Sequence, residues 1–102
     1  MRMLIMFDLP TNTKDERRVA TQFRNFLLKE GFYMIQYSVY VRICNGLDCV
    51  EKYRKRIKTA IPALGSVRLL TITEKQYNGV DILVGEATKY DKSAQWHQLT
   101  FL

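Results

Sequence analysis

The feature that most constrains the fold is an almost uninterrupted apolar run over residues 1–7, which ends at a single carboxylate, Asp8. Strands covered on both faces have this continuous pattern, whereas strands with one wet face alternate apolar and polar residues. Pro10 follows two residues later, and proline cannot donate a hydrogen bond to a sheet. The run therefore predicts a central strand that leaves the sheet at a turn beginning near Asp8.

The next segments predict a helix and then a hairpin. Thr13 and Glu16 have the spacing of a capping box, so we expect a helix that begins there and stops at Gly31. Residues 32–43 are rich in aromatic and β-branched side chains, but twelve positions are long for one strand. Polar residues near the middle of this segment predict two strands joined by a bend or tight turn.

The remaining patterns complete a two-unit topology. Helical spacing returns over residues 45–61, and strand patterns follow at residues 66–73 and 80–87. Two strand–helix–strand units that share one sheet describe a ferredoxin-like fold. We expect an α+β protein: a ferredoxin-like βαββαβ domain over residues 1–87 with an additional C-terminal strand, and a tail over residues 88–102. Because so small a domain leaves apolar surface hard to bury, pairing with a second copy is expected.

Charge and cysteine content narrow the class of protein. The chain has 102 residues and a formal charge of +6, which favours a polyanionic partner, although a basic protein without such a partner stays open. No apolar run approaches the ~20 residues needed to cross a bilayer, and the N-terminus lacks a signal-peptide pattern. We expect a cytoplasmic protein with no membrane contact. Cys44 and Cys49, with His97 the only histidine, form neither a disulfide framework nor a zinc site, so we expect reduced structural thiols.

Basic side chains follow the predicted helices. Lys14, Arg17 and Arg24 recur at helical spacing opposite the apolar face of the first helix, with Arg18 beside them. Such a stripe could meet successive phosphates of a duplex, or it could be a solvated helix face. Five cations also fall within residues 52–58, but they spread around the second helix, so phosphate contact and solubility are equally good explanations.

Asp8 has two interpretations. It could be a turn residue, or it could be a Mg²⁺ ligand, and Mg²⁺ needs octahedral oxygen ligands that one carboxylate cannot supply. The turn over residues 9–12 has no second carboxylate. A two-fold dimer could bring the same residue of a second copy across the axis and so supply two carboxylates from one position.

Aromatic side chains and the tail leave further alternatives. Tyr37 and Tyr40 could stack single-stranded bases, but core packing or a dimer interface explains them, and Phe32, better. Alternating residues near the C-terminus suit a short edge strand, which either adds to a sheet in another chain or covers its own domain.

Several segments together resemble the Cas2 family of CRISPR-associated proteins, in a form like that of type II systems. These segments are "MRMLIMFDLPTNT", the pair Glu16-Arg17, "FRNFLLKEGFYMIQYSVYVRI" and "LLTITEKQY". The resemblance implies a ferredoxin-like homodimer in which Asp8 is the Mg²⁺ ligand, and a metal-dependent endonuclease that acts on RNA or DNA with Asp8 as its catalytic residue. Many relatives carry another acidic residue in the following turn, whereas this chain has Leu9-Pro10-Thr11-Asn12 and thus fewer oxygen ligands.

The resemblance also implies a role in spacer acquisition, which we favour over the enzyme. In that role the dimer bridges two dimers of the Cas1 integrase, and double-stranded prespacer DNA lies across its basic surface. We assign the DNA contacts to one set of cations and the integrase contacts to the tail: Lys14, Arg17, Arg18 and Arg24 for DNA, and Trp96, Leu99 and Phe101 for the partner.

Overall fold

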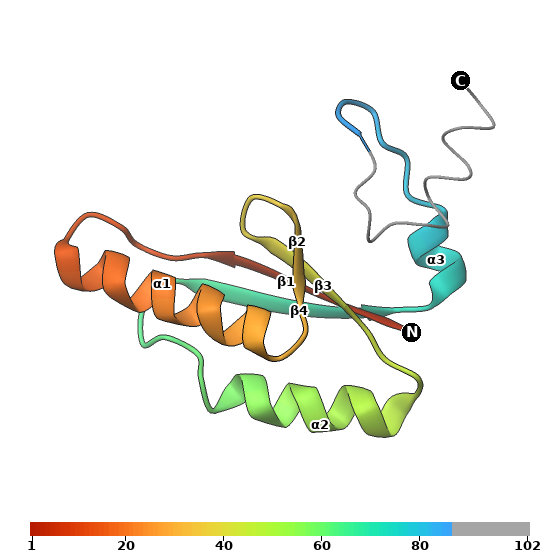
Figure 1. Ribbon diagram of the computed structural model, residues 1–102, viewed down its shortest axis with the longest axis horizontal. Coiled ribbons are helices and arrows are strands. Elements are labelled where there is room, and N and C mark those ends of the chain that lie inside the picture. Colours follow the sequence, from red (N-terminus) through yellow and green to blue (C-terminus); the bar gives the residue numbers. More distant parts are fainter. Residues whose placement is uncertain (87–102) are drawn as a thin grey trace.

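The computed structural model describes residues 1–86, and it has a four-stranded antiparallel sheet of order β2-β3-β1-β4. Two helices, α1 and α2, pack on one face of that sheet, and a short third helix, α3, lies beside the N-terminus (Figure 1). The elements, in chain order, are β1 (Arg2–Asp8), α1 (Lys14–Lys29), β2 (Tyr33–Gln36), β3 (Val39–Ile43), α2 (Leu47–Lys58), β4 (Ser66–Ile72) and α3 (Glu74–Asn78). This is the expected ferredoxin-like order up to β4.

The central position predicted for the first strand is confirmed, because β1 pairs with β3 on one side and with β4 on the other. Alternate β1 residues, Met3, Ile5 and Phe7, are buried against the helices and form the middle of the core. Leu4 and Met6 point to the opposite face of the sheet and are only half-buried. We call that opposite side the open face.

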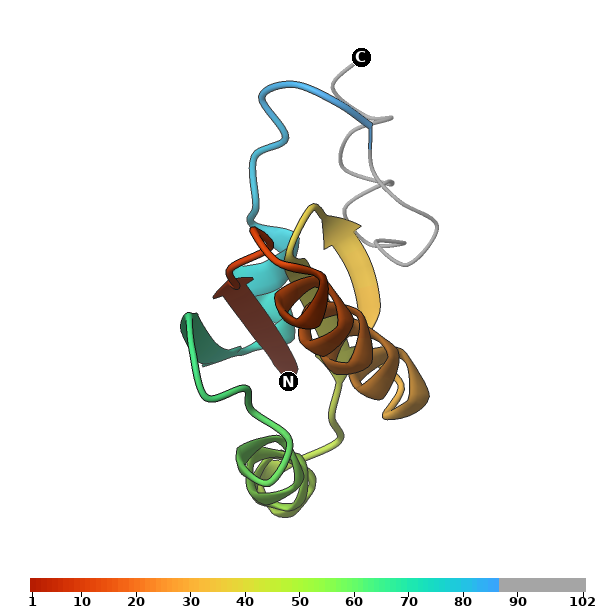
Figure 2. The same cartoon turned by 90° about the vertical axis from the view of Figure 1, so that its left-hand side faces the viewer.

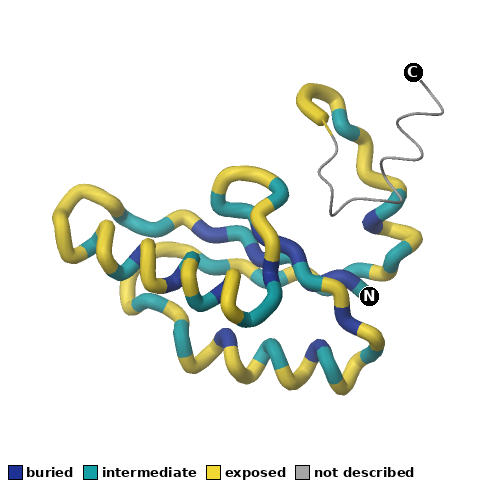
Figure 3. Tube along the Cα trace, in the orientation of Figure 1, coloured by how far each residue is buried: buried dark blue, intermediate teal, exposed yellow. Residues whose placement is uncertain are grey.

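Both main helices follow from their sequence signals. Thr13 and Glu16 form the predicted capping box: the Glu16 amide donates to Thr13 Oγ1 at 3.1 Å, and the Thr13 amide donates to Glu16 Oε1 at 2.9 Å. Gly31 stands just past the end of α1 at φ +89°, a conformation that favours glycine. The outer surfaces of both helices are exposed, and their buried positions face the sheet (Figure 3).

The predicted hairpin is confirmed, with Tyr37 and Ser38 as the turn between β2 and β3. Ser38 adopts a φ of +61°, which is uncommon for a residue other than glycine. Its carbonyl accepts a hydrogen bond from the Phe7 amide at 3.1 Å, so the turn is attached to the end of β1.

The prediction of a strand over residues 80–87 is wrong for the residues that the structure describes. Residues 80–86 form no strand, and the chain between them and β4 folds as α3, a helix that was not among the predicted elements. A second capping box, formed by Thr73 and Gln76, begins this helix and was the sequence signal for it. The tail over residues 88–102, with Trp96, Leu99 and Phe101, lies outside the described residues.

Candidate nucleic-acid and metal site

Asp8 is the last residue of β1, and its side chain is exposed. By strand alternation it faces the open face together with Met6, and its register partner on β4 is Ser66. Gly65, at φ +101°, precedes Ser66, and a Cβ there would lie only 2.6 Å from the Asp8 carbonyl oxygen. The backbone at Asp8 is therefore closely packed, while the carboxylate is left in solvent.

One chain offers few metal ligands at this place. Within residues 1–86 there is no group of three His, Cys, Asp or Glu side chains that could hold a metal ion. Mg²⁺ is usually held by one or two carboxylates, with water and substrate phosphate oxygens completing its octahedron. Asp8 fits such a site as one ligand, and a second copy of Asp8 is the residue that could supply another carboxylate.

Three of the four cations predicted as a stripe lie on the solvent side of α1, whereas Arg24 flanks the buried positions Ala20 and Leu27. Lys14, Arg17 and Arg18 are exposed and Arg24 is half-buried. Arg17 Nη1 donates to the Thr11 carbonyl oxygen at 3.1 Å, so this guanidinium is held against the loop that follows Asp8. With a rise of about 1.5 Å per residue, the stripe from Lys14 to Arg24 is about 15 Å long.

Arg18 has a weak acidic neighbour. Its Nη2 lies 3.7 Å from Asp15 Oδ1, and both side chains are exposed. Exposed pairs of this kind contribute little free energy and are screened by salt. Arg18 therefore stays available to a phosphate, although Asp15 reduces the local positive potential.

Two arginines of α2 form ion pairs within the protein. Arg56 makes two hydrogen bonds with the Glu30 carboxylate, at 2.5 and 2.9 Å, and Arg54 pairs with Glu51. Arg42 stacks over the Tyr53 ring at 3.8 Å and donates to the Tyr53 hydroxyl at 2.6 Å. Of the five cations in residues 52–58, Arg56 therefore joins α2 to the end of α1 and Arg54 pairs within α2, while Arg42 joins β3 to α2.

The aromatic residues considered for base stacking have different environments. Phe32 and Tyr40 are buried in the core, as the core-packing interpretation predicted, whereas 80% of Tyr37 is exposed. Burial raises the pKa of the Tyr40 phenol, the nearby Arg24 guanidinium opposes that rise, and Tyr37 adds to it. The Tyr40 ring is thus inaccessible to a nucleobase, whereas the Tyr37 ring is accessible to one.

The two cysteines are free thiols, in agreement with the sequence prediction. Cys44 is buried, and its thiol lies 3.6 Å from the Met3 sulfur. Burial raises the pKa of Cys44 to about 11, and a hydrogen bond with Cys49 adds to the rise. Such a thiol is a core residue with little thiolate at neutral pH.

Sequence reasoning missed a long-range contact between β1 and α3. Arg2 is buried, its Nε lies 2.9 Å from Glu74 Oε1, and its guanidinium lies 4.2 Å from the centre of the Tyr77 ring. The available signal was a single basic residue inside an apolar strand. This contact anchors α3, and with it the start of residues 79–86, beside the open face.

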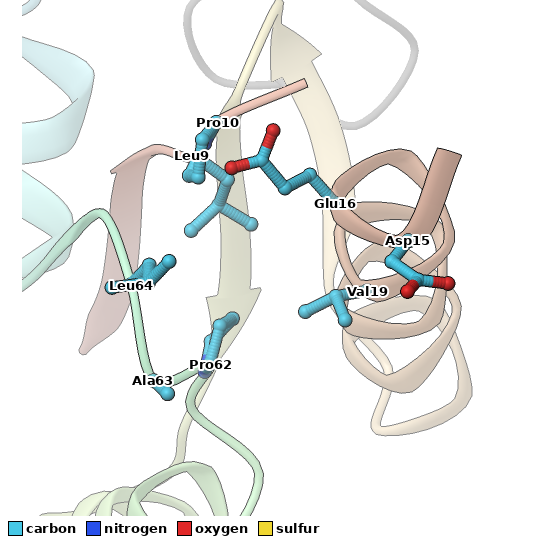
Figure 4. A pocket seen from close by; sticks show the side chains of 8 residues that line it. All are labelled: Leu9, Pro10, Asp15, Glu16, Val19, Pro62, Ala63 and Leu64. Carbon is cyan, nitrogen blue, oxygen red and sulfur yellow. The ribbon is translucent and has the colours of Figure 1, made fainter. Parts of the chain in front are cut away.

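Two hollows lie away from the Asp8 carboxylate. A small one of about 160 Å³ lies between the loop after β1, the start of α1 and the loop before β4 (Figure 4). Its walls are mostly apolar, with Leu9, Val19 and Leu64 among them, and carboxylates of Asp15 and Glu16 stand at one side. A larger one of about 760 Å³ lies between Leu4, Ile72, Tyr77 and residues 80–86, on the open face.

The open face keeps apolar side chains in solvent. Tyr33, Ile43 and Leu70, which flank Val41 and Leu4 in the strand register, are each about half exposed. Leu83 and Val84 are 90% and 94% exposed in the segment that leaves α3 (Figure 2 shows this segment extending away from the sheet). None of the helices in residues 1–86 has the length and apolar character that crossing a membrane requires.

Comparison with known proteins gives consistent matches. Residues 1–80 match the family model described as CRISPR associated protein Cas2. A protein of Acidovorax ebreus named CRISPR-associated endoribonuclease Cas2 is 53% identical over 85 residues, which cover 83% of each chain. A protein of the same name from Ligilactobacillus salivarius is 48% identical over 89 residues, covering 87% of this chain and 88% of that one. The crystal structure of Streptococcus pyogenes Cas2 at pH 6.5 superposes with a TM-score of 0.62 at 20% identity, covering 82% of this chain and 100% of that one, which supports the fold.

Proposed function

This chain belongs to the Cas2 family of CRISPR-associated proteins, and on that premise we propose that it is a scaffold for spacer acquisition. In this role a homodimer holds double-stranded prespacer DNA and bridges two dimers of the Cas1 integrase. The observation that carries the proposal is the row of accessible cations on α1, Lys14, Arg17 and Arg18, extended by Arg24.

A stripe of this kind suits backbone contact. Duplex phosphates recur every ~3.4 Å along each strand, so a row about 15 Å long spans several of them. Contacts to phosphates fix position without reading sequence. A protein that must accept DNA of any sequence needs such contacts rather than side chains that read base edges.

The open face supports the homodimer. Its half-exposed side chains, Tyr33, Ile43 and Leu70, lie on neighbouring strands, and the apolar segment with Leu83 and Val84 extends beside them. Burial of apolar area gives roughly 25 cal/mol per Å². A second copy packed on this face would remove these side chains from water and bring two Asp8 residues to one side of the assembly.

The integrase contact is assigned to the tail. His97, Leu99 and Phe101 alternate with Trp96, Gln98 and Thr100, as expected for a strand that adds to the edge of another protein's sheet. In such a strand Leu99 and Phe101 share one face and Trp96 lies on the other. Deletion of residues 95–102 should abolish co-purification with Cas1 while DNA affinity is retained.

Charge reversal on α1 tests the DNA contact directly. Arg17→Glu combined with Arg18→Glu should weaken duplex binding strongly. If the four cations each neutralise one phosphate, the slope of log affinity against log salt is about −3.6 per protomer, and two fewer contacts reduce its size by about 1.8. The matched control, Lys52→Glu with Lys55→Glu, makes the same charge change on the outer side of α2. If both pairs weaken binding equally, net charge rather than the α1 stripe holds the DNA.

A Mg²⁺-dependent endonuclease is the alternative function, favoured by the exposed carboxylate of Asp8 and by relatives named endoribonuclease. Bound Mg²⁺ would supply an activated water and would neutralise phosphate charge. The role of Asp8 is to hold the ion, together with the second copy of Asp8.

Asp8→Asn and Asp8→Ala separate the two functions. Each variant should be assayed for spacer integration with Cas1 and for Mg²⁺-dependent cleavage of RNA and DNA. Retained integration with lost cleavage means that scaffolding is the role and that the metal chemistry is dispensable. Loss of both from a folded dimer would place the metal site in the mechanism, and cleavage that persists in Asp8→Ala would point to a contaminating nuclease.

A further inference from the structure

Tyr37 is unusual among the aromatic residues of the described chain. It is 80% exposed, whereas the phenylalanines and tyrosines of the core, such as Phe32 and Tyr40, are almost fully buried. A solvent-exposed aromatic ring forgoes the hydrophobic stabilisation that burial gives, and its surface is left open to a planar partner.

The turn holds Tyr37 in a fixed place. Gln36 and Val39 pair on either side of it, which leaves Tyr37 and Ser38 as the two turn residues. Ser38 takes the left-handed φ of +61°, and its carbonyl accepts the hydrogen bond from Phe7. A non-glycine residue in this conformation persists only where its surroundings hold it, and such residues concentrate at functional sites. The ring is therefore presented by a well-connected turn.

The surroundings of Tyr37 are cationic on the side of α1. The Tyr40 ring stacks on Phe7 at 5.6 Å, and Phe7 packs edge-on against Phe23 of α1 at 5.2 Å, so the hairpin lies against the part of α1 that carries Arg24. The Arg24 guanidinium and Tyr37 both influence the pKa of the Tyr40 phenol, in agreement with this packing. Arg24 is also the last member of the stripe that begins at Lys14. The ring thus stands at one end of the row of phosphate-binding side chains, and the Phe7–Ser38 hydrogen bond sets its turn beside the end of β1.

We propose that Tyr37 is a stacking site for an unpaired nucleobase of a DNA strand whose phosphates lie on the α1 stripe. Every base has an aromatic face, so stacking on Tyr37 is tolerant of sequence, and a nearby arginine adds attraction. In a closed duplex both faces of each base are covered by its neighbours. The site therefore takes a base in a single-stranded overhang, a frayed end or a distorted step.

This inference rests on the proposed DNA contact of α1 but is separable from it. The stripe sets affinity for any duplex, and Tyr37 adds affinity only where a base is unpaired. Failure of the α1 contact would appear as unchanged binding of blunt duplex after charge reversal of Arg17 and Arg18. Failure of the Tyr37 site would appear as equal binding of blunt and overhanging DNA by the wild-type protein.

The test compares two DNA probes of the same duplex sequence, one blunt and one with a short single-stranded overhang that carries 2-aminopurine. The full-length wild-type protein should bind the overhanging probe more tightly and quench the 2-aminopurine fluorescence. Base–aromatic stacking corresponds to an affinity ratio of about 5-fold to 150-fold. Tyr37→Leu should lose this preference and the quenching, with blunt-duplex affinity unchanged, whereas Tyr37→Phe should keep both.

Met34→Ala is the matched control, because it removes another exposed apolar side chain from the same hairpin. It should leave the preference intact. The proposal is overturned if wild type shows no quenching, if Tyr37→Leu weakens both probes equally, or if Met34→Ala has the same effect as Tyr37→Leu. Should Tyr37→Leu fail to fold, Tyr37→Phe and the wild-type probe comparison still decide the outcome.

Discussion

Gly65→Ala is the substitution for which the structure gives the clearest energetic expectation. Gly65 has a φ of +101°, and an added Cβ would lie 2.6 Å from the Asp8 carbonyl oxygen and 2.9 Å from Leu9 Cδ2. The left-handed backbone costs a residue with a Cβ about 1–2 kcal/mol, and overpacking against fixed atoms typically costs about 1–3 kcal/mol. The lower entropy of the unfolded alanine chain offsets only about 0.4–1 kcal/mol. We therefore expect a net loss of about 3 kcal/mol.

Urea denaturation followed by circular dichroism measures this loss. Domains of this size have slopes of about 1–3 kcal/mol per M, so the midpoint should fall by about 1–3 M urea. Protein concentration must be kept the same for all variants, because the proposed association with a second copy would make apparent stability concentration-dependent.

Substitutions at two other glycines distinguish the cost of backbone strain from the cost of a steric clash. Gly85 has a φ of +104° and nothing within 4 Å of an added Cβ, so Gly85→Ala carries the backbone strain alone. Gly46, in extended backbone at φ −179°, has neither strain nor collision, and Gly46→Ala should change stability by less than about 0.5 kcal/mol because loss of a tolerable N-cap offsets the entropy gain. If Gly65→Ala is no worse than Gly85→Ala, the reasoning from the Asp8 contact is refuted.

Three further predictions concern caps, core and pH. Thr13→Ala removes the capping box and should lower the free energy of unfolding by about 1 kcal/mol in the same urea experiment, with no effect if water replaces the cap fully. Arg2→Met leaves Glu74 without its partner, so hydrogen exchange of the α3 amides should accelerate while the β1 amides stay protected; equal acceleration in both would show that Arg2 supports the sheet instead. The folded-state pKa of Cys44, about 11, lies above its ordinary value of 9.0, so the folded protein holds this proton more tightly than the unfolded chain does. Its contribution to stability is complete below about pH 9 and is lost as the pH rises toward 11; Cys44→Ala should flatten that part of the stability profile.

Local signals predicted the elements well because their causes are local. Thr13 and Glu16 cap a helix through atoms three residues apart, and the long aromatic segment had to turn because a strand of its length exceeds the sheet. The family resemblance is confirmed by the match over residues 1–80. These features needed no knowledge of distant parts of the chain.

The failures concern interactions that depend on distant or external partners. Residues 80–86 carry a strand pattern, but a strand forms only beside another strand, and composition does not say whether that neighbour is in the same chain. The ion pair between Arg2 and Glu74 joins residues 72 positions apart, and no local periodicity predicts it. Tyr37 and Tyr40 look equivalent in sequence, yet one is 80% exposed and the other 3%. Tyr37 lies in the hairpin turn, whereas Tyr40 lies on β3 opposite the buried Ile5 and faces the helices.

The charge of Asp8 matters for both the scaffold and the nuclease proposals. The α1 stripe attracts phosphates, and Arg17 is tied to the loop that follows Asp8, so an unneutralised carboxylate there opposes DNA binding. If the proposed homodimer holds Mg²⁺ between two copies of Asp8, the ion removes that repulsion whether or not a bond is cut. Duplex affinity of the wild-type dimer should therefore rise when Mg²⁺ is added, although divalent ions ordinarily weaken DNA binding by screening and competition. Asp8→Asn should bind well without Mg²⁺ and show only the ordinary weakening. If wild type and Asp8→Asn respond to Mg²⁺ identically, Asp8 neither holds the ion nor faces the DNA, and its place at the end of β1 is that of a turn residue.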